Sequence, residues 1–398
     1  MLMRNLLMIA VTLLINGCAS DMWRPQTSSG EITREQIAPP HDIAIMLPLK
    51  DKGELAWTSQ AIRNGFLAAY YASQPQSGVN IKVIDTNGGD VDKLYHQAVA
   101  DGAEIVVGPL TKHEVELIAN INPLPVPTIA LNTLDDYRHN VRNNLYQFGL
   151  LPQDEARQVA VKMAQEQLNN AAIIVPEGLW GDKIVAEFTR EYEVSGKQIA
   201  ATLRYRFGRD LAGQICNFLA NDAAKLCTPQ KNKKQKKSDE IMRRQDIDAI
   251  FFVATTPVQA RQIVPLLKFY YAGDLPIYSI STVYGGVSRP YLDQDINGVY
   301  FCDMPWVVAP PGSFSPSLQA IHKQIATTTL WAESFASYSK FYALGIDAYN
   351  LAVSLNVLLN APQNGVPGAS GTLYLDGFNH IYRELQWSQI RNGVVRDF

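Results

Sequence analysis

The segment "AEIVVGPLTKHEVELIANINPLPVPTIALN" (residues 103–132) indicates the fold class of this 398-residue chain. Its first part, "AEIVVGP", is apolar almost throughout, which is typical of a strand buried on both faces of a parallel sheet. "KHEVELIANI" then predicts a helix, and "VPTIALN" predicts the next strand. Parallel neighbours need a helical crossover, so the segment predicts a β–α–β unit. At Gly108 the backbone must turn from strand to helix within two residues, which requires the close approach or unusual φ that glycine permits.

The same alternation continues on both sides of this segment. On the N-terminal side, strands are predicted over 42–49 and 79–86, and helices over 58–73 and 91–102. On the C-terminal side, a helix beginning at Pro152 opens a second series of the same kind. The strands predicted in that series are 171–176, 199–207, 247–255 and 275–281, and its further helices are 182–193, 210–222 and 257–273. Two such series predict two doubly wound α/β lobes.

The rest of the chain adds to both lobes. Helical segments are predicted over 315–329 and 342–360, and period-2 residues around Asp376-Gly377 predict an antiparallel hairpin. These leftover elements suggest that the chain crosses between the lobes more than once. We therefore predict a bilobed α/β protein with a cleft at the carboxyl ends of its parallel strands, where open α/β sheets bind ligands.

The N-terminal residues 1–17 fit a secretory signal peptide. Arg4 is followed by an apolar run from Leu6 to Ile15, and this run is half of the roughly 20 residues that a membrane-spanning helix needs.

Ile15-Asn16-Gly17-Cys18 resembles the bacterial lipobox, whose cysteine is acylated after cleavage, although Asn16 departs from the usual Ala, Ser or Thr. The alternative is a plain signal followed by an incidental cysteine. We expect acylation of Cys18 and a flexible tether over residues 18–40, which lack apolar periodicity. By the same resemblance, Ala19 after the cysteine implies sorting to the outer membrane.

Charge and motifs exclude several function classes. The net charge is −3 and the sequence pI is about 6.1, so no basic field points to nucleic acid. Phosphate-loop, dinucleotide-binding and zinc-binding motifs are absent from the sequence, which predicts neither a cofactor nor a metal. Ser337-Tyr338-Ser339-Lys340 matches the S-x-x-K of penicillin-recognising enzymes, but no K-T-G follows it. We therefore predict no catalytic residue and no enzyme.

Polar, acidic and aromatic residues gather where predicted strands pass into helices. Backbone N–H groups at helix starts can hold an anion, assisted by hydroxyl groups. An amino-acid receptor would place Thr111 and Thr133 in one lobe, with Glu177 or Asp182 opposite for the ligand amine. The full set of cleft candidates is Thr111, Asn132, Thr133, Glu177, Trp180, Asp182, Thr255, Thr256 and Tyr284. The alternative is that these residues only cap helices and shape turns.

The sequence contains 4 cysteines. If Cys18 is acylated, three remain for an oxidising compartment. Cys216 and Cys227 are close enough in sequence to close a short disulfide loop, which would leave Cys302 unpaired. It is equally consistent with the sequence that Cys216 and Cys227 are two small buried residues that form no disulfide.

Six blocks in order along the chain resemble the LppC/LpoA lipoproteins, which are outer-membrane activators of a class A penicillin-binding protein. The blocks are "VGPLTKHEVE", "PTIALNT", "DAIFFVATTPVQARQIVPLLKFYYAGDLPIYS", "NGVYFCDMPW", "YALGIDAYNLA" and "GTLYLDGFNHIYRELQW". The resemblance runs from about His41 to the C-terminus and implies a type 1 periplasmic-binding-protein-like fold. It places one lobe in 41–149 plus 303–364 and the other in 150–302 plus 365–398.

The resemblance also implies a function. We expect a lipid-anchored, non-enzymatic regulator that binds and activates a peptidoglycan synthase from the periplasmic face of the outer membrane. A periplasmic receptor for an amino acid or peptide is the alternative. Longer relatives carry a helical-repeat domain between anchor and bilobed domain, whereas only the tether precedes the lobes here, so the reach toward peptidoglycan is expected to differ.

Overall fold

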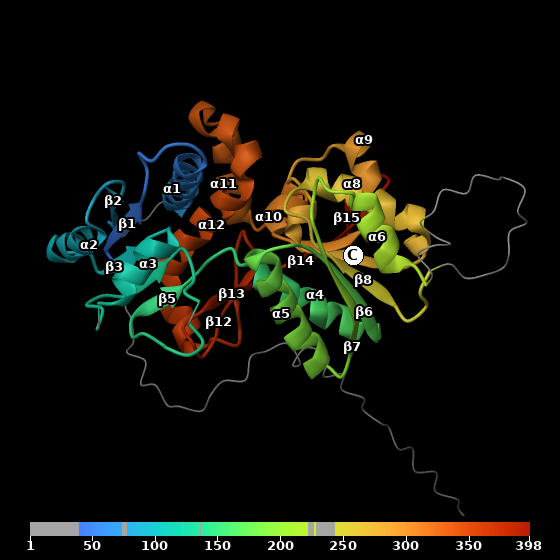
Figure 1. Ribbon diagram of the computed structural model, residues 1–398. Coiled ribbons are helices and arrows are strands. Elements are labelled where there is room, and N and C mark those ends of the chain that lie inside the picture. Colours follow the sequence, from blue (N-terminus) through green and yellow to red (C-terminus); the bar gives the residue numbers. More distant parts are fainter. Residues whose placement is uncertain (1–39, 74–77, 122, 136, 222–226, 228–242) are drawn as a thin grey trace, which may run out of the picture.

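The computed structural model describes residues 40–73, 78–121, 123–135, 137–221, 227 and 243–398, which form two lobes side by side (Figure 1). The predicted signal peptide, Cys18 and all of the predicted tether except its last residue lie outside the described residues. Each lobe is built on a sheet of its own, with strand orders β2-β1-β3-β4-β5 and β15-β14-β10-β9-β8-β6-β7. The predicted α/β fold class is therefore confirmed.

The first sheet is parallel throughout. Its strands are β1 (Asp42–Leu47), β2 (Asn80–Asp85), β3 (Ile105–Val107), β4 (Thr128–Ala130) and β5 (Leu145–Gln147). The helices of this lobe are α1 (Glu54–Ser73), α2 (Val91–Ala100), α3 (Lys112–Ala119), α11 (Pro316–Thr327) and α12 (Thr329–Asn360). Successive residues of β1 face opposite layers: Ile43 and Ile45 pack with α1 and α12, whereas Ala44 and Met46 pack with α2 and α3. Burial on both faces explains the continuous apolar runs of these strands.

The second sheet is parallel from β10 to β7 and antiparallel at β14 and β15. Its strands are β6 (Asn170–Pro176), β7 (Gln198–Tyr205), β8 (Ala249–Phe252), β9 (Ile277–Ser279), β10 (Tyr300–Asp303), β14 (Gln386–Arg391) and β15 (Val394–Asp397). Its α-helices are α4 (Pro152–Gln165), α5 (Leu179–Val194), α6 (Leu211–Leu219), α8 (Pro257–Leu267), α9 (Pro290–Asp293) and α10 (Pro305–Val308). The single-turn elements are η1 (Lys268–Ala272), η2 (Ser281–Val283), η3 (Gln294–Ile296) and η4 (Pro311–Ser313). Ile173 faces the layer of α4 and α5, and Ile174 faces that of α6 and α8.

The predicted hairpin around Asp376-Gly377 is confirmed, and it lies between the lobes. The strands β12 (Thr372–Leu375) and β13 (Ile381–Glu384) pair antiparallel, and β11 (Val366–Pro367) extends them to a three-stranded sheet. Asp376 closes the turn by accepting from the backbone N–H groups of Phe378 and His380, at 2.8 and 2.9 Å. β12 contacts α12 and β13 contacts α4, so the small sheet touches both lobes. The division of whole residue ranges between the lobes stays a prediction.

α1 and α12 cross at two glycines. A Cβ atom on Gly65 would lie 2.2 Å from the carbonyl oxygen of Tyr342, and one on Gly345 would lie 2.0 Å from that of Ile62. The two backbones are thus in direct contact. Among the described residues α12 alone is long and apolar enough to span a membrane, but 72% of its apolar window is buried in the protein. It is a core helix of the first lobe.

The strand-to-helix turn after β3 requires glycine, as predicted. Gly108 has a φ of 101°, and a Cβ atom there would lie 2.2 Å from the carbonyl oxygen of Met46. The helix predicted over 257–273 ends early, because α8 stops at Leu267 and passes into the π-helical turn η1. Pro265 in its last turn cannot donate a helical hydrogen bond, which favours this change of pattern.

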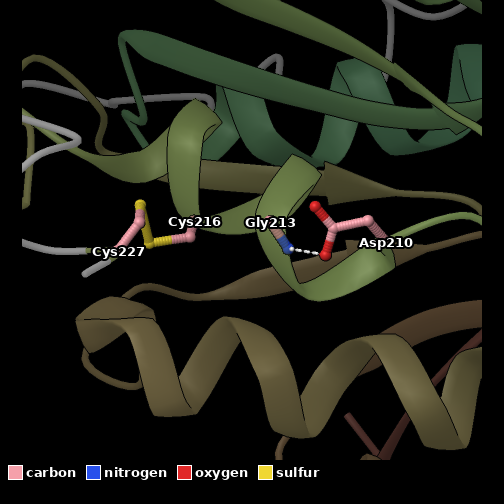
Figure 2. Close-up of a disulfide and its surroundings, with 4 residues drawn as sticks. All are labelled: Asp210, Gly213, Cys216 and Cys227. Carbon is pink, nitrogen blue, oxygen red and sulfur yellow. Dashed lines mark hydrogen bonds between the residues drawn. A yellow bond between two sulfur atoms is a disulfide. The ribbon is translucent and has the colours of Figure 1, made fainter. Parts of the chain in front are cut away.

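Cys216, on α6, and Cys227 form a disulfide with their Cα atoms 5.7 Å apart (Figure 2). Asp210 caps the same helix by accepting from the backbone N–H of Gly213 at 3.1 Å. Cys302 is a free thiol, fully buried at the end of β10.

Candidate functional site

The cleft candidates of the first lobe are bonded to neighbouring groups of their own lobe. Thr111 is the N-cap of α3, and it exchanges hydrogen bonds with Glu114 in a capping box. The side chain of Asn132 donates to the carbonyl of Leu110 at 3.0 Å and accepts from the backbone N–H of Thr133 at 2.9 Å. The hydroxyl of Thr133 is buried and has no hydrogen-bond partner among the described residues. It is the one hydroxyl of this group left for a further partner in the described chain.

The acidic candidates of the second lobe are held in ion pairs on its surface. Glu177 accepts from the guanidinium of Arg206 at 2.6 Å, and Asp182 accepts from that of Arg204 at 2.6 Å. The side chain of Arg206 lowers the pKa of Glu177 by hydrogen bonding. Both carboxylates are thus neutralised by arginines of the adjacent β7 end.

The other candidates of the second lobe are a cap, a backbone donor and two aromatic residues. Thr256 is the N-cap of α8, and the N–H of Thr255 donates to the side chain of Gln259 at 3.3 Å. Tyr284 is buried against Phe301, and its burial is the main cause that raises its pKa to about 12. Trp180 remains 36% exposed at the start of α5.

The structure brings the candidates of each lobe together but does not join the two groups. Within the second lobe, the backbone N–H of Glu177 donates to the carbonyl of Tyr205, and Thr282 donates to the carbonyl of Ala254. These contacts align the ends of β6, β7, β8 and β9 along one edge. No hydrogen bond or ion pair between described residues links a first-lobe candidate to a second-lobe candidate.

Residues outside the predicted set connect the two lobes. Asp135, which follows β4, lies between two lysines: its carboxylate is 2.5 Å from Lys112 on α3 and 2.8 Å from Lys183 on α5. All three side chains are partly exposed. The ion pair with Lys183 therefore ties the start of the second-lobe helix α5 to the first lobe. Nothing in the local sequence distinguishes Asp135 from an ordinary turn residue.

A second connection between the two lobes is more deeply buried than the ion pair of Asp135 with Lys183. Arg138 of the first lobe donates to both carboxylate oxygens of Glu187 on α5, at 3.0 and 2.9 Å. Arg157 on α4 donates to the same carboxylate at 3.0 Å and to Asp154 at 2.7 Å. The imidazole of His380 lies 3.3 Å from Asp154 and is fully buried. The charges alternate in sign from Arg138 to His380, so each buried charge has an opposite partner.

This cluster shifts the pKa values of its members. Burial opposes the ionisation of Glu187, but hydrogen bonds from Arg138 and other arginine charges outweigh it and lower its pKa to about 2. Burial also opposes the charged form of His380, but the carboxylates of Asp154 and Asp376 outweigh it and raise its pKa to about 9. At neutral pH the cluster is therefore fully charged.

The lysine of the S-x-x-K sequence has a structural role at the third connection. Lys340 on α12 lies 2.9 Å from Asp303 at the end of β10 and donates to the carbonyl of Ser281 at 3.2 Å. Glu155 on α4 accepts from the backbone N–H and the hydroxyl of Ser281, at 2.8 and 3.1 Å. Within the described residues no group of three potential metal ligands occurs. In the part of the chain that the structure describes, these charged groups connect the two lobes by ion pairs and hydrogen bonds.

The family described as "LppC putative lipoprotein" matches residues 25–393, which is most of the chain. The chain belongs to the LppC family. The LppC chain is 28% identical over 364 residues to the "Penicillin-binding protein activator LpoA" of Vibrio antiquarius (strain Ex25), a match that covers 89% of this chain and 58% of that protein. It therefore spans less than two thirds of the length of such curated relatives.

Solved structures share the fold of this LppC chain. The C-domain of LpoA from Haemophilus influenzae, titled "a regulator of PBP1A", matches with a TM-score of 0.69 at 23% identity, over 90% of this chain and 99% of that one. A "putative branched-chain amino acid ABC transporter" from Chromobacterium violaceum matches with a TM-score of 0.63 at 25% identity, over 88% of this chain and 99% of that one. The type 1 periplasmic-binding-protein-like fold is thus confirmed.

Proposed function

We propose that this LppC protein is a non-enzymatic lipoprotein that binds a class A penicillin-binding protein and activates its peptidoglycan synthesis. The family and the names of its relatives support this function. Activation requires that the docked protein bind the active conformer of the synthase more tightly than the inactive one.

The observation that carries the proposal is the pairing of the charged side chains at and beside the predicted cleft residues. Asp135 joins Lys112 and Lys183, while Glu177 and Asp182 are neutralised by arginines. A receptor for a free amino acid needs unpaired groups for the ligand amine and carboxylate. Breaking the existing pairs would cost part of the binding free energy. A surface that docks a protein has no such requirement.

Localisation follows from the same proposal. We infer that Cys18 is acylated and that residues 18–40 tether the lobes to the periplasmic face of the outer membrane. Palmitate labelling of the wild type and its loss in Cys18→Ala would support this anchor. Labelling that persists in the variant would contradict it.

The decisive experiment combines binding with activity. The acylated protein is mixed with the purified class A penicillin-binding proteins of the same bacterium, and the transpeptidase rate is followed on lipid-linked peptidoglycan precursor. We expect binding to one synthase and a higher rate with that synthase. Binding without any change in rate would overturn activation, and absence of binding would overturn the proposed function.

A solute receptor is the second candidate, favoured by the shared fold with the Chromobacterium protein and by the free hydroxyl of Thr133. A ligand at a hundredfold excess over its Kd stabilises a protein by about 2.7 kcal/mol, which raises Tm by several degrees. We expect no such shift with any single proteinogenic amino acid at millimolar concentration. A reproducible shift that Thr133→Val abolishes would favour the receptor.

A further inference from the structure

Five exposed apolar side chains lie at the carboxyl edge of the second sheet. Their exposed fractions are 82% for Leu179, 36% for Trp180, 41% for Phe207, 59% for Val258 and 39% for Val287. We call these five residues the apolar rim. Leu179 and Trp180 follow β6, Phe207 follows β7, Val258 follows β8 and Val287 follows β9. Exposed apolar residues are common singly, but a row on one edge indicates an interaction site.

The rim is continuous because its four strands are neighbours. The strand order β9-β8-β6-β7 places the ends of these strands side by side, about 15 Å across at the usual spacing of about 4.8 Å. Hydrogen bonds join the segments beyond the strands: Glu177 to Tyr205, the hydroxyl of Tyr205 to Gln259, and Thr282 to Ala254. The loops that carry the rim therefore form one surface.

The charges around the rim leave a small excess of positive charge. The charged side chains flanking it are Glu177, Asp182, Asp210, Lys183, Arg204, Arg206, Arg209 and Arg289. Two of the three acids are in ion pairs with arginines, and Asp210 is a helix cap. Anionic membranes are bound by clusters of about four to eight basic residues and nucleic acids by many phosphate contacts, so the small positive excess at this edge is insufficient for either. The surface that complements it is an apolar patch bordered by acidic groups on another protein.

The corresponding edge of the first sheet is different. Apolar residues that follow its strands are buried, with exposed fractions of 8% for Leu110, 2% for Leu131 and 4% for Leu134. Trp57 on α1 is 54% exposed and Val141 in the segment after β4 is 38% exposed, and other exposed apolar residues of that lobe, such as Leu117 and Leu330, lie on its helices. The row of exposed apolar residues thus belongs to the second sheet.

We propose that the apolar rim is the surface on which the peptidoglycan synthase docks, an inference that rests on the proposed function. The rim supplies two aromatic groups and three aliphatic groups for the centre of an interface, and the surrounding arginines and carboxylates supply its polar surround. The synthase side of this contact is a patch of apolar residues bordered by acidic ones.

Matched substitutions test the rim on the full-length protein. Leu179→Ser and Val258→Ser are combined to disrupt it. The control combines Val194→Ser and Phe269→Ser: Val194 is 77% exposed at the far end of α5, and Phe269 is 73% exposed just beyond the far end of α8. The two variants remove similar exposed apolar area from opposite edges of the same sheet. Thermal unfolding of both is compared with the wild type, and we expect it unchanged because the replaced side chains are exposed.

Binding is measured by surface plasmon resonance with the purified class A penicillin-binding proteins of the same bacterium. We expect the rim variant to bind the synthase at least tenfold more weakly than the wild type, and the control variant to change less than twofold. Equal binding by wild type and rim variant overturns the rim while the proposed function stands. If the rim variant and the control variant bind the synthase equally weakly, the rim proposal is also overturned, because the loss of binding is then not specific to the rim.

Two further outcomes would also overturn the rim as the docking surface. If the wild type binds no synthase, the proposed function fails and the rim proposal fails with it. Analytical ultracentrifugation is run in parallel. A wild-type dimer that becomes a monomer in the rim variant, with unchanged synthase binding, makes the rim a contact between two copies of this chain and overturns the proposal.

Discussion

Two contacts of the first lobe differ in their chemistry: its internal contact between α1 and α12, and its contact with α5 of the second lobe. At the first, Gly65 and Gly345 let two apolar helices touch backbone to backbone. At the second, Asp135 and Arg138 form ion pairs with Lys183 and Glu187. Close apolar packing has one satisfactory geometry, since any added atom forces the helices apart. Ion pairs depend on protonation and salt, and they weaken gradually with distance.

The two contacts differ in how much change they tolerate. Close backbone packing inside the first lobe leaves no room for an added atom, whereas the relative position of the lobes depends partly on charged groups that respond to pH and salt. The largest expected effect of substitution therefore lies inside the first lobe, and the smallest lies at the exposed bridge between the lobes.

Gly345→Val tests the helix crossing. A Cβ atom at this position would lie 2.0 Å from a backbone oxygen, so α1 and α12 must separate or the chain must unfold. We expect the free energy of unfolding, measured in urea, to fall by about 4 kcal/mol or more. A side chain that clashes with backbone atoms cannot relieve the clash by changing its rotamer. Gly312→Ala is the control, since a Cβ atom there meets nothing within 4 Å. Similar stability of the two variants would show that the crossing is loose.

Glu187→Gln tests the buried part of the interlobe contact. The substitution removes the charge that pairs with Arg138 and Arg157, of which Arg157 is almost fully buried. We expect the free energy of unfolding, measured in urea, to fall by about 3 kcal/mol. Hydrogen exchange should become faster in α5 and stay unchanged in α1 and α12. Glu193→Gln, at an exposed position of the same helix, should leave both measurements unchanged. Faster exchange in α12 would contradict the separation of the two contacts.

The pH dependence of stability tests the buried contact between the lobes through His380. Its folded-state pKa, about 9, is raised above the ordinary value of 6.5, so its stabilising effect is complete below pH 6.5 and is lost as the pH rises through 9. We expect the free energy of unfolding to fall by about 3 kcal/mol from pH 6 to pH 9. In His380→Gln this loss should be absent. The same slope in both proteins would assign the pH dependence to another group.

Asp135→Asn gives the smallest expected effect. Its side chain is 66% exposed, and exposed ion pairs contribute less than about 1 kcal/mol. The difference in the free energy of unfolding between variant and wild type should disappear in 1 M NaCl, because salt at this concentration screens charges over a Debye length of about 3 Å. If the free energy of unfolding fell by several kcal/mol and salt did not restore it, the ion pairs of Asp135 would be as important for stability as the contact between α1 and α12.

The fold class and most of the order of its elements could be predicted from the amino-acid sequence alone. Apolar runs such as "EIVVG" and the helical spacing of the segments between them are local signals, because burial of a strand on both faces or of a helix on one face leaves its pattern in adjacent residues. Local signals also located the glycine turn at Gly108, the first turn of α4 at Pro152 and the hairpin at Asp376.

The partners of the candidate residues, and the residues that join the lobes, could be identified only from the three-dimensional structure. Asp135 and Lys183 are separated by 48 residues, and Gln158 and Leu385, joined by a hydrogen bond, by 227. No periodicity records such pairs, because they depend on how the helices and sheets pack. The ion pairs of Glu177 and Asp182 likewise depend on the neighbour of β6 in the sheet being β7. The apolar rim has the same origin: four separate loops carry it, and the strand order alone makes them one surface.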